Sequence, residues 1–453
     1  MEKFVNKKVG LIGLGISNLY LANYLAKNNR VFVTEELNED KLKDKLDKLD
    51  KFVEYECGGH TDKILESDIV IRSPGIPRHH SLIQKVLSKK IPVFTELEIS
   101  FQIIKSKINK IPKIVAITGT NGKTTTTTLV GKILSSCYPD VIVAGNIGIP
   151  LINFVDRINE DTIIVLEVSS YQLEDIVEFK PYISCILNIT EDHLEHHISM
   201  ENYISAKTKI FINQTKKDFL ILKYDDENIN KIDFKKINPK IIFFSRNDLD
   251  EGCWWQKDSK KIIFKFKDYF EEFVVYPKIP GEHNIENILA SVCCSVLLNV
   301  PKKNIEKTVS EFPGVEHRLE FVREIDGVIF VNDSKSTNVD STLVALKSFD
   351  VPIHLILGGR DKKAPYTPLF DLIKEKVKTI LLIGEATEII YSQIKNLNVI
   401  IYKCKTLENA VLKAKEVAKK GEIVLLSPAC ASFDQFKNFE HRGQVFKEIV
   451  NRL

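Results

Sequence analysis

The sequence predicts an α/β protein of three domains, each built around a mainly parallel sheet. Two glycine-rich turns, at residues 10–15 and 119–122, each follow an apolar strand and lead into a helix. Beyond residue 314, short apolar strands alternate with helical segments, which is typical of a further parallel sheet. A chain of 453 residues is long enough for about three domains. We expect these domains to span residues 1–108, 109–313 and 314–453.

The first domain is expected to be a small parallel sheet that binds a mononucleotide. Strands are predicted at residues 8–15, 30–34, 68–75 and 91–94, with a helix at 17–27. Gly13 and Gly15 suit the turn of a Rossmann nucleotide-binding fold, but Asn18 replaces the third glycine of the dinucleotide fingerprint. Glu35 lies where a ribose-binding acid is expected. UDP or another single nucleotide therefore fits this domain better than a dinucleotide does.

The second domain is expected to be a doubly wound sheet with a small antiparallel ribbon. A lysine-rich stretch at residues 105–110 predicts a linker before it. Parallel strands are predicted at 113–117, 140–146, 162–167 and 182–188, spaced by helical patterns. Alternating apolar residues between 241 and 276 predict the ribbon, in which we expect Trp254 and Trp255 to pack in the core or at an edge. The strands of the third domain are predicted at 327–332, 351–358, 377–384, 399–403 and 422–427.

The segment Ile117-Thr-Gly-Thr-Asn-Gly-Lys-Thr-Thr125 predicts a phosphate-binding loop. It joins a β-branched strand to a helix start, an arrangement that aims backbone N–H groups at the phosphates of a nucleotide. Lys123 can reach the terminal phosphates, and the Thr124 hydroxyl can bind Mg²⁺. Ile117 stands where the strict motif has its first glycine, which separates this loop from those of the commonest kinases and GTPases. We expect ATP or GTP as the ligand.

Two candidate metal ligands follow strands of the same sheet. Glu167 ends an apolar strand, where the sheet opens onto the ligand crevice, so it could hold Mg²⁺ or cap a helix. His193 follows the next predicted strand and is expected on the same rim. His196 and His197 are interpreted as solvent-facing, because no zinc protease or zinc deaminase pattern accompanies them.

Polar residues also gather in the last part of the chain. Asn284 and Asn287 lie three residues apart at a helix start and share a helix face, which suits an adenine edge. N-capping explains one of them equally well. Two loops that follow strands, at 332–338 and 427–434, are rich in hydroxyl groups, and the first contains a lysine. Such loops fit the recognition of a small polar substrate.

The composition argues against several classes of function. With 64 basic and 61 acidic residues, the charge is nearly balanced, so we expect no nucleic-acid or membrane partner. No apolar stretch approaches the roughly 18–20 residues that a membrane helix needs. The 8 cysteines have neither the spacing of a zinc site nor the density of a disulfide scaffold, and fit reduced thiols. We expect a first strand in place of a signal peptide, and therefore a cytoplasmic protein.

Eight motifs, in one order along residues 10–443, resemble the Mur ligases of peptidoglycan synthesis. They are the phosphate loop, Gly145-Asn-Ile-Gly148, Glu167, Asn188-Ile-Thr-Glu-Asp-His193, Gly281-Glu-His-Asn-Ile-Glu-Asn287, Glu316-His-Arg318, Asn332-Asp-Ser-Lys-Ser-Thr-Asn338 and the run 427–439, Ser-Pro-Ala-Cys-Ala-Ser-Phe-Asp-Gln-Phe-Lys-Asn-Phe. The resemblance implies an N-terminal Rossmann-like domain that binds a UDP-sugar and a central P-loop ATPase-like domain. It also implies a C-terminal Rossmann-like domain that admits an amino acid.

The resemblance further implies a reaction. In this family a substrate carboxylate takes the γ-phosphate of ATP, and an incoming amine then replaces phosphate in the acyl phosphate to form an amide. A carboxylate is a poor acyl donor until phosphorylation gives it a good leaving group, so positioning and charge neutralisation remain as the work of the protein. The implied partners are UDP-N-acetylmuramoyl-L-alanine, D-glutamate, ATP and two Mg²⁺ ions, and a monomer is expected.

Roles for single residues are carried over from the matching motifs. Catalytic roles fall on Lys123, His193 and Lys207. The ATP contacts are Gly119, Thr120, Asn121, Gly122, Lys123, Thr124, Thr125, Asn284, Asn287, Arg318 and Asp333, with Lys335 in the same loop as Asp333. The UDP-sugar contacts are Gly15, Ile16, Ser17, Thr34, Glu35, Ser73, Gly75, Asn146 and His193, and the D-glutamate contacts are Thr337, Lys362, Ser432 and Phe439. The metal ligands are Thr124, Glu167, His193 and Lys207.

Several alternatives stay open. Lys207 matches a lysine that the family carbamylates at Nζ, and Lys209 is a rival for that role. Either Lys362 or Lys363 could meet the side-chain carboxylate of glutamate, with Arg360 as a further cation nearby.

Other functions also remain to be weighed. Another Mur ligase, or a ligase like folylpolyglutamate synthase, would share the central domain, but the latter lacks a separate UDP-binding domain. A non-catalytic nucleotide-binding protein would have no need for Glu167, His193 and Asp333 together at the ends of strands. An NAD-dependent oxidoreductase would rest on Gly13, Gly15 and Glu35 alone.

Overall fold

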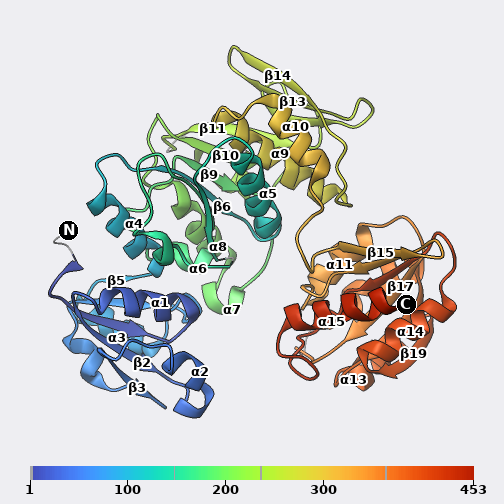
Figure 1. The fold of residues 1–453 in the computed structure, drawn as a ribbon, viewed down its shortest axis with the longest axis horizontal. Helices are drawn as coiled ribbons and strands as arrows, with labels where there is room; N and C mark the ends of the chain where they lie inside the picture. The colour runs from blue at the N-terminus through green and yellow to red at the C-terminus, as the bar shows by residue number, and fades with distance from the viewer. Residues whose placement is uncertain (1–3, 147, 235–236, 363–364) are drawn as a thin grey trace. The chain divides into compact units, whose positions relative to one another are not determined.

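The computed structural model describes residues 4–146, 148–234, 237–362 and 365–453, and its strands form three sheets (Figure 1). By its internal contacts the chain divides into two compact units, Met1–Val275 with Glu286–Val309, and Tyr276–Ile285 with Ser310–Leu453. Two sheets belong to the first unit and one to the second. The predicted α/β class is confirmed, whereas the exact domain boundaries stay a prediction. Among the described helices, none has both the length and the apolar character to cross a membrane.

The N-terminal sheet has five parallel strands in the order β3-β2-β1-β4-β5. Its strands are β1 (Lys8–Ile12), β2 (Arg30–Glu35), β3 (Val53–Cys57), β4 (Ile69–Arg72) and β5 (Val93–Phe94). Its helices are α1 (Ile16–Leu25), α2 (Lys43–Leu46), α3 (Ser81–Ser88) and α4 (Glu96–Lys107). The predicted linker at 105–110 is wrong in its first half, because Lys105 and Lys107 lie in the last turn of α4 and pair with Glu178 and Asp156.

The central sheet has nine strands in the order β14-β13-β12-β11-β10-β9-β6-β8-β7. The strands are β6 (Lys113–Thr118), β7 (Val141–Gly145), β8 (Ile163–Glu167), β9 (Ile183–Ile186), β10 (Phe219–Lys223), β11 (Lys240–Ser245), β12 (Gly252–Gln256), β13 (Lys261–Phe266) and β14 (Tyr269–Val274). The helices are α5 (Lys123–Ser135), α6 (Ser170–Leu173), α7 (Leu194–His197), α8 (Met200–Thr208), α9 (Glu282–Leu297) and α10 (Lys302–Glu311). Strands β8 and β9 are buried along their whole length, as expected of parallel strands covered on both faces.

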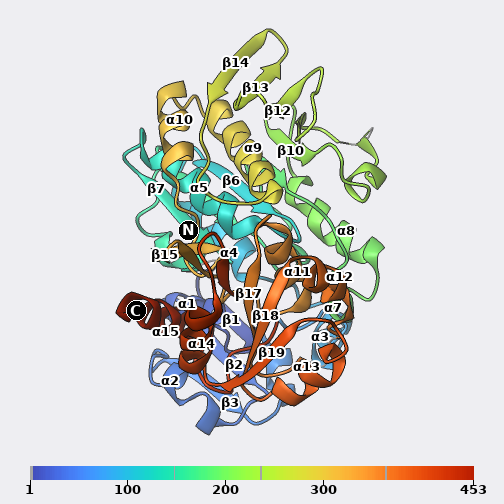
Figure 2. The ribbon, with the colours of Figure 1, turned by 90° about the vertical axis from the view of Figure 1, so that its right-hand side faces the viewer.

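The antiparallel ribbon is shorter than the sequence predicts. Strand β11 pairs in parallel with both β10 and β12, so only β12, β13 and β14 form the ribbon (Figure 2). Trp254 and Trp255 both lie on β12, the first buried and the second half-buried. An apolar alternation identifies a strand but does not fix the direction of its neighbours, which explains the error.

The C-terminal sheet has six strands in the order β15-β16-β20-β17-β18-β19. The strands are β15 (Glu320–Ile325), β16 (Val328–Asn332), β17 (Ile353–Gly358), β18 (Val377–Ile383), β19 (Ile400–Lys405) and β20 (Ile423–Leu426). The helices are α11 (Val339–Lys347), α12 (Phe370–Lys376), α13 (Thr387–Ile394), α14 (Leu407–Val417) and α15 (Phe439–Arg452). Figure 2 shows β17, β18 and β19 side by side, and all pairs except β15 with β16 are parallel.

Candidate functional site

The phosphate loop turns sharply between β6 and α5. Gly122 immediately precedes α5 and has a φ of 83°, which favours glycine. A Cβ atom at this position would lie 2.2 Å from Oδ1 of Asn287, so the side chain from α9 also demands glycine here. The Thr126 hydroxyl donates to the same Oδ1 at 3.3 Å. Asn287, predicted as an ATP contact, therefore lies directly against the phosphate loop.

Asn188, at the end of the β9 strand region, fixes the shape of the loop. Its side chain accepts from the backbone N–H of Asn121 at 2.8 Å and donates to the Asn121 carbonyl at 3.1 Å. The Thr120 N–H donates to the Asn188 carbonyl at 3.0 Å. This positioning role was not predicted, although Asn188 opens one of the quoted motifs. A polar residue directly after a buried strand was the available signal.

Thr124 and Glu167 form a pair of oxygen donors beside the loop. The Thr124 hydroxyl donates to Oε2 of Glu167 at 2.8 Å, and the Asn146 amide donates to Oε1 at 2.9 Å. Glu167 is 3% exposed at the end of β8. Hydroxyl and carboxylate oxygens are the ligands that Mg²⁺ prefers, so these residues fit the ion that the sequence predicts. Asn146, predicted near the sugar, lies against this pair.

Two lysine amines bind the same carbonyl oxygen of the loop. Lys123 Nζ donates to the Gly119 carbonyl at 2.9 Å and to the Thr120 carbonyl at 2.8 Å. Lys207 Nζ, reaching in from α8, also donates to the Gly119 carbonyl at 2.9 Å. Lys207 is 1% exposed, and this burial together with the charge of Lys123 holds its pKa well below the usual value. This placement favours the uncharged form of the Lys207 amine.

Lys209 points away from the loop, toward the backbone carbonyl of Glu174. Of the two lysines that the sequence leaves open, only Lys207 contacts the phosphate loop. His193 stands close by: burial lowers its pKa, and the charges of Lys123 and Lys207 lower it further, against the carboxylate of Asp192. Its backbone has a φ of 56°, just before α7. The ring of Tyr203 lies between two of these groups, with its centroid 4.5 Å from Lys207 Nζ and 6.4 Å from that of the His193 ring.

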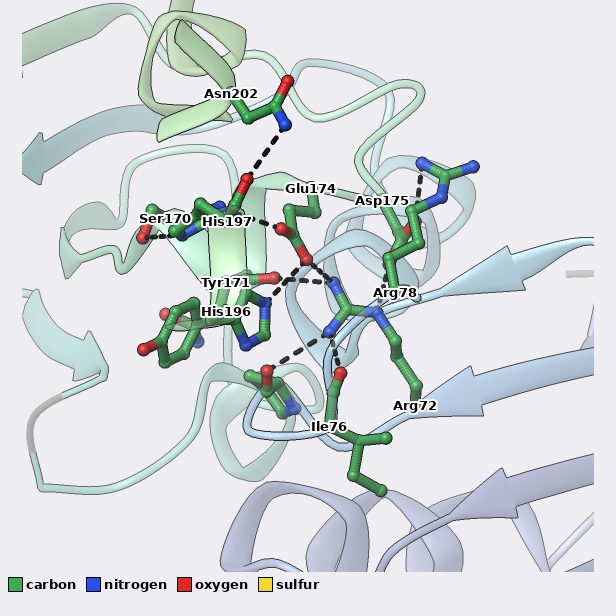
Figure 3. Close-up of polar contacts among 12 residues, drawn as sticks. Arg72, Ile76, Arg78, Ser170, Tyr171, Glu174, Asp175, His196, His197 and Asn202 are labelled. Atoms are coloured by element: carbon green, nitrogen blue, oxygen red, sulfur yellow. Dashed lines mark hydrogen bonds and ion pairs between the residues drawn. The ribbon is translucent and has the colours of Figure 1, made fainter. Parts of the chain in front are cut away.

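The interpretation of His196 and His197 as solvent-facing is wrong. They are 7% and 3% exposed. His196 Nε2 lies 3.1 Å from Oε2 of Glu174, and His197 Nδ1 lies 3.0 Å from Oε1 (Figure 3). The ring of Tyr171 stacks on His196 with centroids 3.9 Å apart. The single turn of α7 turns both rings inward, which a run of polar letters in the sequence does not reveal.

A buried arginine links this cluster to the N-terminal sheet. Arg72, at the end of β4, lies 2.5 Å from Oε2 of Glu174 and 2.5 Å from Oδ2 of Asp175. It also donates to the backbone carbonyl of Ile76 at 2.6 Å, and Arg78 reaches Oδ1 of Asp175 at 3.2 Å (Figure 3). Sequence reasoning missed this network, because its members lie about a hundred residues apart and no motif joins them.

The predicted uridine contacts surround the first glycine turn. Gly15 precedes α1, and a Cβ atom there would lie 2.8 Å from the Ser73 hydroxyl at the end of β4. Glu35 accepts from the Leu14 N–H at 2.7 Å and from the Leu37 N–H at 3.1 Å. The other members of the predicted set gather at the same ends of parallel strands: Ile16, Ser17, Thr34 and Gly75.

The missing third glycine is also explained. Asn18 is buried and donates to the carbonyls of Ile12 at 3.2 Å and Gly13 at 2.8 Å, so its side chain ties the turn together. One oxygen of Glu35 accepts from Leu14 in the glycine turn and the other accepts from Leu37 just after β2. This acid therefore ties the glycine turn to the segment that follows β2.

In the second unit, Asp333 connects three loops. Its carboxylate accepts from the hydroxyls of Ser336 at 2.5 Å and Ser427 at 2.8 Å, and from the Leu319 N–H at 3.2 Å. Complete burial raises the pKa of Asp333 to about 6, although these hydrogen bonds and the charge of Arg318 oppose the rise. The two hydroxyl-rich loops predicted from the sequence are therefore joined through one acid.

The predicted glutamate contacts lie on the same unit. Lys362 Nζ donates to the Thr337 hydroxyl at 3.5 Å, while its rival Lys363 lies outside the described residues. Arg360 pairs with Glu385 instead. Ser432 is 2% exposed, and Phe439 is the first residue of α15.

Asn284 serves a local role. Its side-chain amide donates to the carbonyl of Pro280 at 2.5 Å, beside the start of α9. Arg318 lies near His283, and burial together with this charge lowers the pKa of His283 to about 4. Both observations fit polar groups held in place at the start of a helix.

Known proteins match this chain along its whole length. Residues 8–82 match the MurD N-terminal domain, 117–295 the Mur ligase middle domain and 317–430 the glutamate ligase domain of Mur ligases. The UDP-N-acetylmuramoylalanine–D-glutamate ligase of Koribacter versatilis is 43% identical over 453 residues, which covers 99% of this chain and 98% of that protein. The ligase of the same name from Clostridioides difficile is 41% identical over 454 residues, covering 99% of both.

Solved structures share the fold. The MurF ligase of Thermotoga maritima in complex with ADP has a TM-score of 0.59 at 16% identity and covers 100% of both chains. The UDP-N-acetylmuramate–alanine ligase of the same organism has a TM-score of 0.59 at 19% identity, covering 99% of this chain and 100% of that one. With its full-length relatives at 43% and 41% identity, the chain belongs to the Mur ligase family, alongside the UDP-N-acetylmuramoylalanine–D-glutamate ligases.

Proposed function

We propose that this chain is an ATP-dependent ligase of cytoplasmic peptidoglycan precursor synthesis. It adds D-glutamate to UDP-N-acetylmuramoyl-L-alanine through an acyl phosphate, with ADP and phosphate as the other products. The observation that carries the proposal is the convergence of Lys123 and Lys207 on the Gly119 carbonyl, beside the Thr124–Glu167 pair. Such a cluster suits the activation of a carboxylate by ATP, and the full-length relatives are named for this reaction.

Transfer of the phosphoryl group depends on positioning and charge. Lys123 is a fixed positive charge on the loop, suited to the β- and γ-phosphates, and the loop amides add further N–H donors. Thr124 and Glu167 would hold Mg²⁺ through their oxygens. Bound Mg²⁺ would neutralise the charge of the phosphates. His193, beside Lys123 and Lys207, would contribute at the carboxylate end.

Lys207 is the proposed site of carbamylation. An amine attacks CO₂ only in its uncharged form, and the burial of Lys207 favours that form. The product is an anionic carbamate, whose two oxygens could ligate a second Mg²⁺ near the acyl phosphate. The Lys207 amine competes with Lys123 for the Gly119 carbonyl. A carbamate in its place would be negatively charged and would attract the Lys123 amine. Lys209, which faces Glu174, offers no such geometry.

The two substrates would approach from different parts of the chain. The uridine end would lie on the first glycine turn, at Gly15 and Ser73, with Glu35 acting through the backbone that it holds. The D-glutamate carboxylates would meet Lys362, with the hydroxyls of Thr337 and Ser432 as partners. A cation and neutral donors suit an acidic amino acid.

The test is phosphate release from ATP by the purified protein. UDP-N-acetylmuramoyl-L-alanine is supplied with a panel of D- and L-amino acids, and the product is identified by its mass. We expect release with D-glutamate and very little with L-glutamate or with D-alanine. Release that requires a different amino acid would assign the chain to another Mur ligase reaction. Release with a folate in place of the UDP-sugar would favour folylpolyglutamate chemistry.

A further inference from the structure

A cluster beyond the proposed ligase site carries a second inference. The carboxylate of Glu174 and the rings of His196 and His197, here called the histidine site, have one ligand atom each within 4.8 Å of the others. We propose that the histidine site binds a divalent transition metal of the Zn²⁺ type. This metal is separate from the ions of the proposed ligation, and its binding can be measured without ATP or substrate.

The three ligand atoms lie close enough to meet one tetrahedral ion after a small rearrangement. In the structure His196 Nε2 is 3.1 Å from Oε2 of Glu174 and His197 Nδ1 is 3.0 Å from Oε1, and the three residues each have a ligand atom within 4.8 Å of the others. Ligand atoms at about 2.0–2.1 Å from Zn²⁺ stand about 3.3–3.4 Å apart in a tetrahedral site. Movements of up to about 1.5 Å would therefore bring the three atoms around one ion. Each ring proton would move to the other nitrogen, so that no proton need leave the site.

Neighbouring residues hold all three ligands in place. The Ser170 hydroxyl lies 2.9 Å from Nε2 of His197, the nitrogen opposite the proposed ligand atom. Tyr171 stacks on the ring of His196. Arg72 fixes the carboxylate of Glu174 from the side of the N-terminal sheet (Figure 3). Partners of this kind orient ligands and are a usual part of metal sites.

The ligand types select the class of metal. Arg72 pairs with Glu174, and Arg78 and Lys209 line the adjoining cavity, so three cations oppose any divalent ion and only strong ligand bonds can hold one. A site with one shared carboxylate is poor for Mg²⁺ or Ca²⁺, which need several oxygen ligands. Two imidazole nitrogens suit Zn²⁺, Co²⁺, Ni²⁺ or Cu²⁺.

A cavity gives an ion access and a further ligand. It has a volume of about 300 Å³ and is lined by all three members of the histidine site and by Asn202 and Ser205 of α8. Water in this cavity can complete the coordination. Of the other clusters among the described residues, the one of Glu316, His317 and Glu320 offers a single imidazole, which suits a metal of this class less well.

The test is Co²⁺ binding to the full chain after chelator treatment, in excess Mg²⁺ so that oxygen sites are filled. Four- or five-coordinate Co²⁺ with nitrogen ligands absorbs visible light. We expect one Co²⁺ per chain, displaced by one Zn²⁺, and a melting temperature raised by a few degrees at about hundredfold excess over Kd. H196Q and H197Q should each weaken binding at least about 100-fold, and S170A about 10–100-fold.

The matched control is H79Q, which changes a histidine of the same cavity outside the ligand set and should bind like the unaltered protein. Glutamine can still donate to Glu174, so the two ligand variants should keep the fold, which far-UV circular dichroism checks. If they fail to fold, S170A carries the test. Absence of a visible band with the unaltered protein, or H196Q, H197Q and S170A all binding as tightly as it does, overturns the proposal. Loss of ligase activity alone would bear only on the proposed function.

Discussion

Removing Arg72 should destabilise the first unit by an amount that its contacts define. Arg72→Met keeps the length of the side chain but leaves two buried carboxylates without their central cation. Removing one partner of a buried ion pair costs about 3–5 kcal/mol. Here Asp175 keeps Arg78 at 3.2 Å, and Glu174 keeps His196 and His197. The loss should therefore lie near the lower end, at roughly 3 kcal/mol.

Urea unfolding followed by tryptophan fluorescence measures this loss. Both tryptophans of the chain belong to the first unit, so the signal reports on the unit that contains Arg72. With a urea dependence of about 3 kcal/mol per molar, the midpoint should fall by about 1 M. Far-UV circular dichroism should show the same shift for this unit.

Two further variants separate charge burial from general damage. Lys105→Met breaks the exposed pair with Glu178 and should change the free energy of unfolding by about 0–1 kcal/mol. The triple variant Arg72→Met, Glu174→Gln, Asp175→Asn removes the central cation together with both carboxylates, leaves only the half-exposed Arg78, and should recover most of the loss. An Arg72→Met midpoint no lower than that of Lys105→Met would refute the reasoning. So would a triple variant at least as unstable as the single one.

Three other predictions concern the ligase site. Lys123→Ala should abolish ATP-dependent phosphate release with the far-UV spectrum unchanged, because the cation of the loop is lost; near-normal turnover would contradict this role. Lys207→Ala should lose activity that added formate or acetate partly restores, whereas Lys209→Ala should show no such rescue. The raised pKa of Asp333 makes its contribution to stability fully present below about pH 4 and lost as the pH rises through about 6. Asparagine does not ionise, so Asp333→Asn should not share this loss. We therefore expect the free energy of unfolding of the variant, relative to that of the unaltered protein, to rise by roughly 2–3 kcal/mol between pH 4 and pH 7. Urea unfolding followed by circular dichroism measures both values, and a difference that does not change with pH would count against the prediction.

Most strands could be predicted from the sequence, in the middle of the sheets and at edges such as β7 and β19. Strands β8 and β9 are continuous apolar runs, because helices cover both faces of the sheet. Strand β10, the apolar run Phe-Leu-Ile-Leu-Lys inside the central sheet, was missed although its pattern is strong. The other missed strands, β3 and β15, stand at sheet edges, where Val-Glu-Tyr-Glu-Cys and Glu-Phe-Val-Arg-Glu-Ile mix charged residues with apolar ones. Half-exposed edges need few apolar side chains, so their pattern is weak.

Part of the candidate site could also be predicted from the sequence, and part could not. Residues that follow strands, such as Thr124, Glu167 and Asp333, could be located because the ends of parallel strands meet at one edge. The finding that Lys207, and not Lys209, contacts the phosphate loop required the directions of a side chain on α8 and of one just after it, which spacing alone does not supply. The bridge from Arg72 depends on tertiary contacts across about a hundred residues, and local patterns carry no signal of it.

The burial of Lys207 gives the proposed carbamate a practical consequence. If Lys207 is carbamylated as proposed, an amine that is 1% exposed beneath the phosphate loop should exchange CO₂ slowly, so its state should reflect how the protein was prepared. Batches purified under argon and batches kept in bicarbonate should then differ in specific activity at equal purity. We expect that incubation with bicarbonate, before the nucleotide is added, brings the specific activities of the two kinds of batch to the same value. The order of mixing should therefore matter in inhibitor screens against this protein.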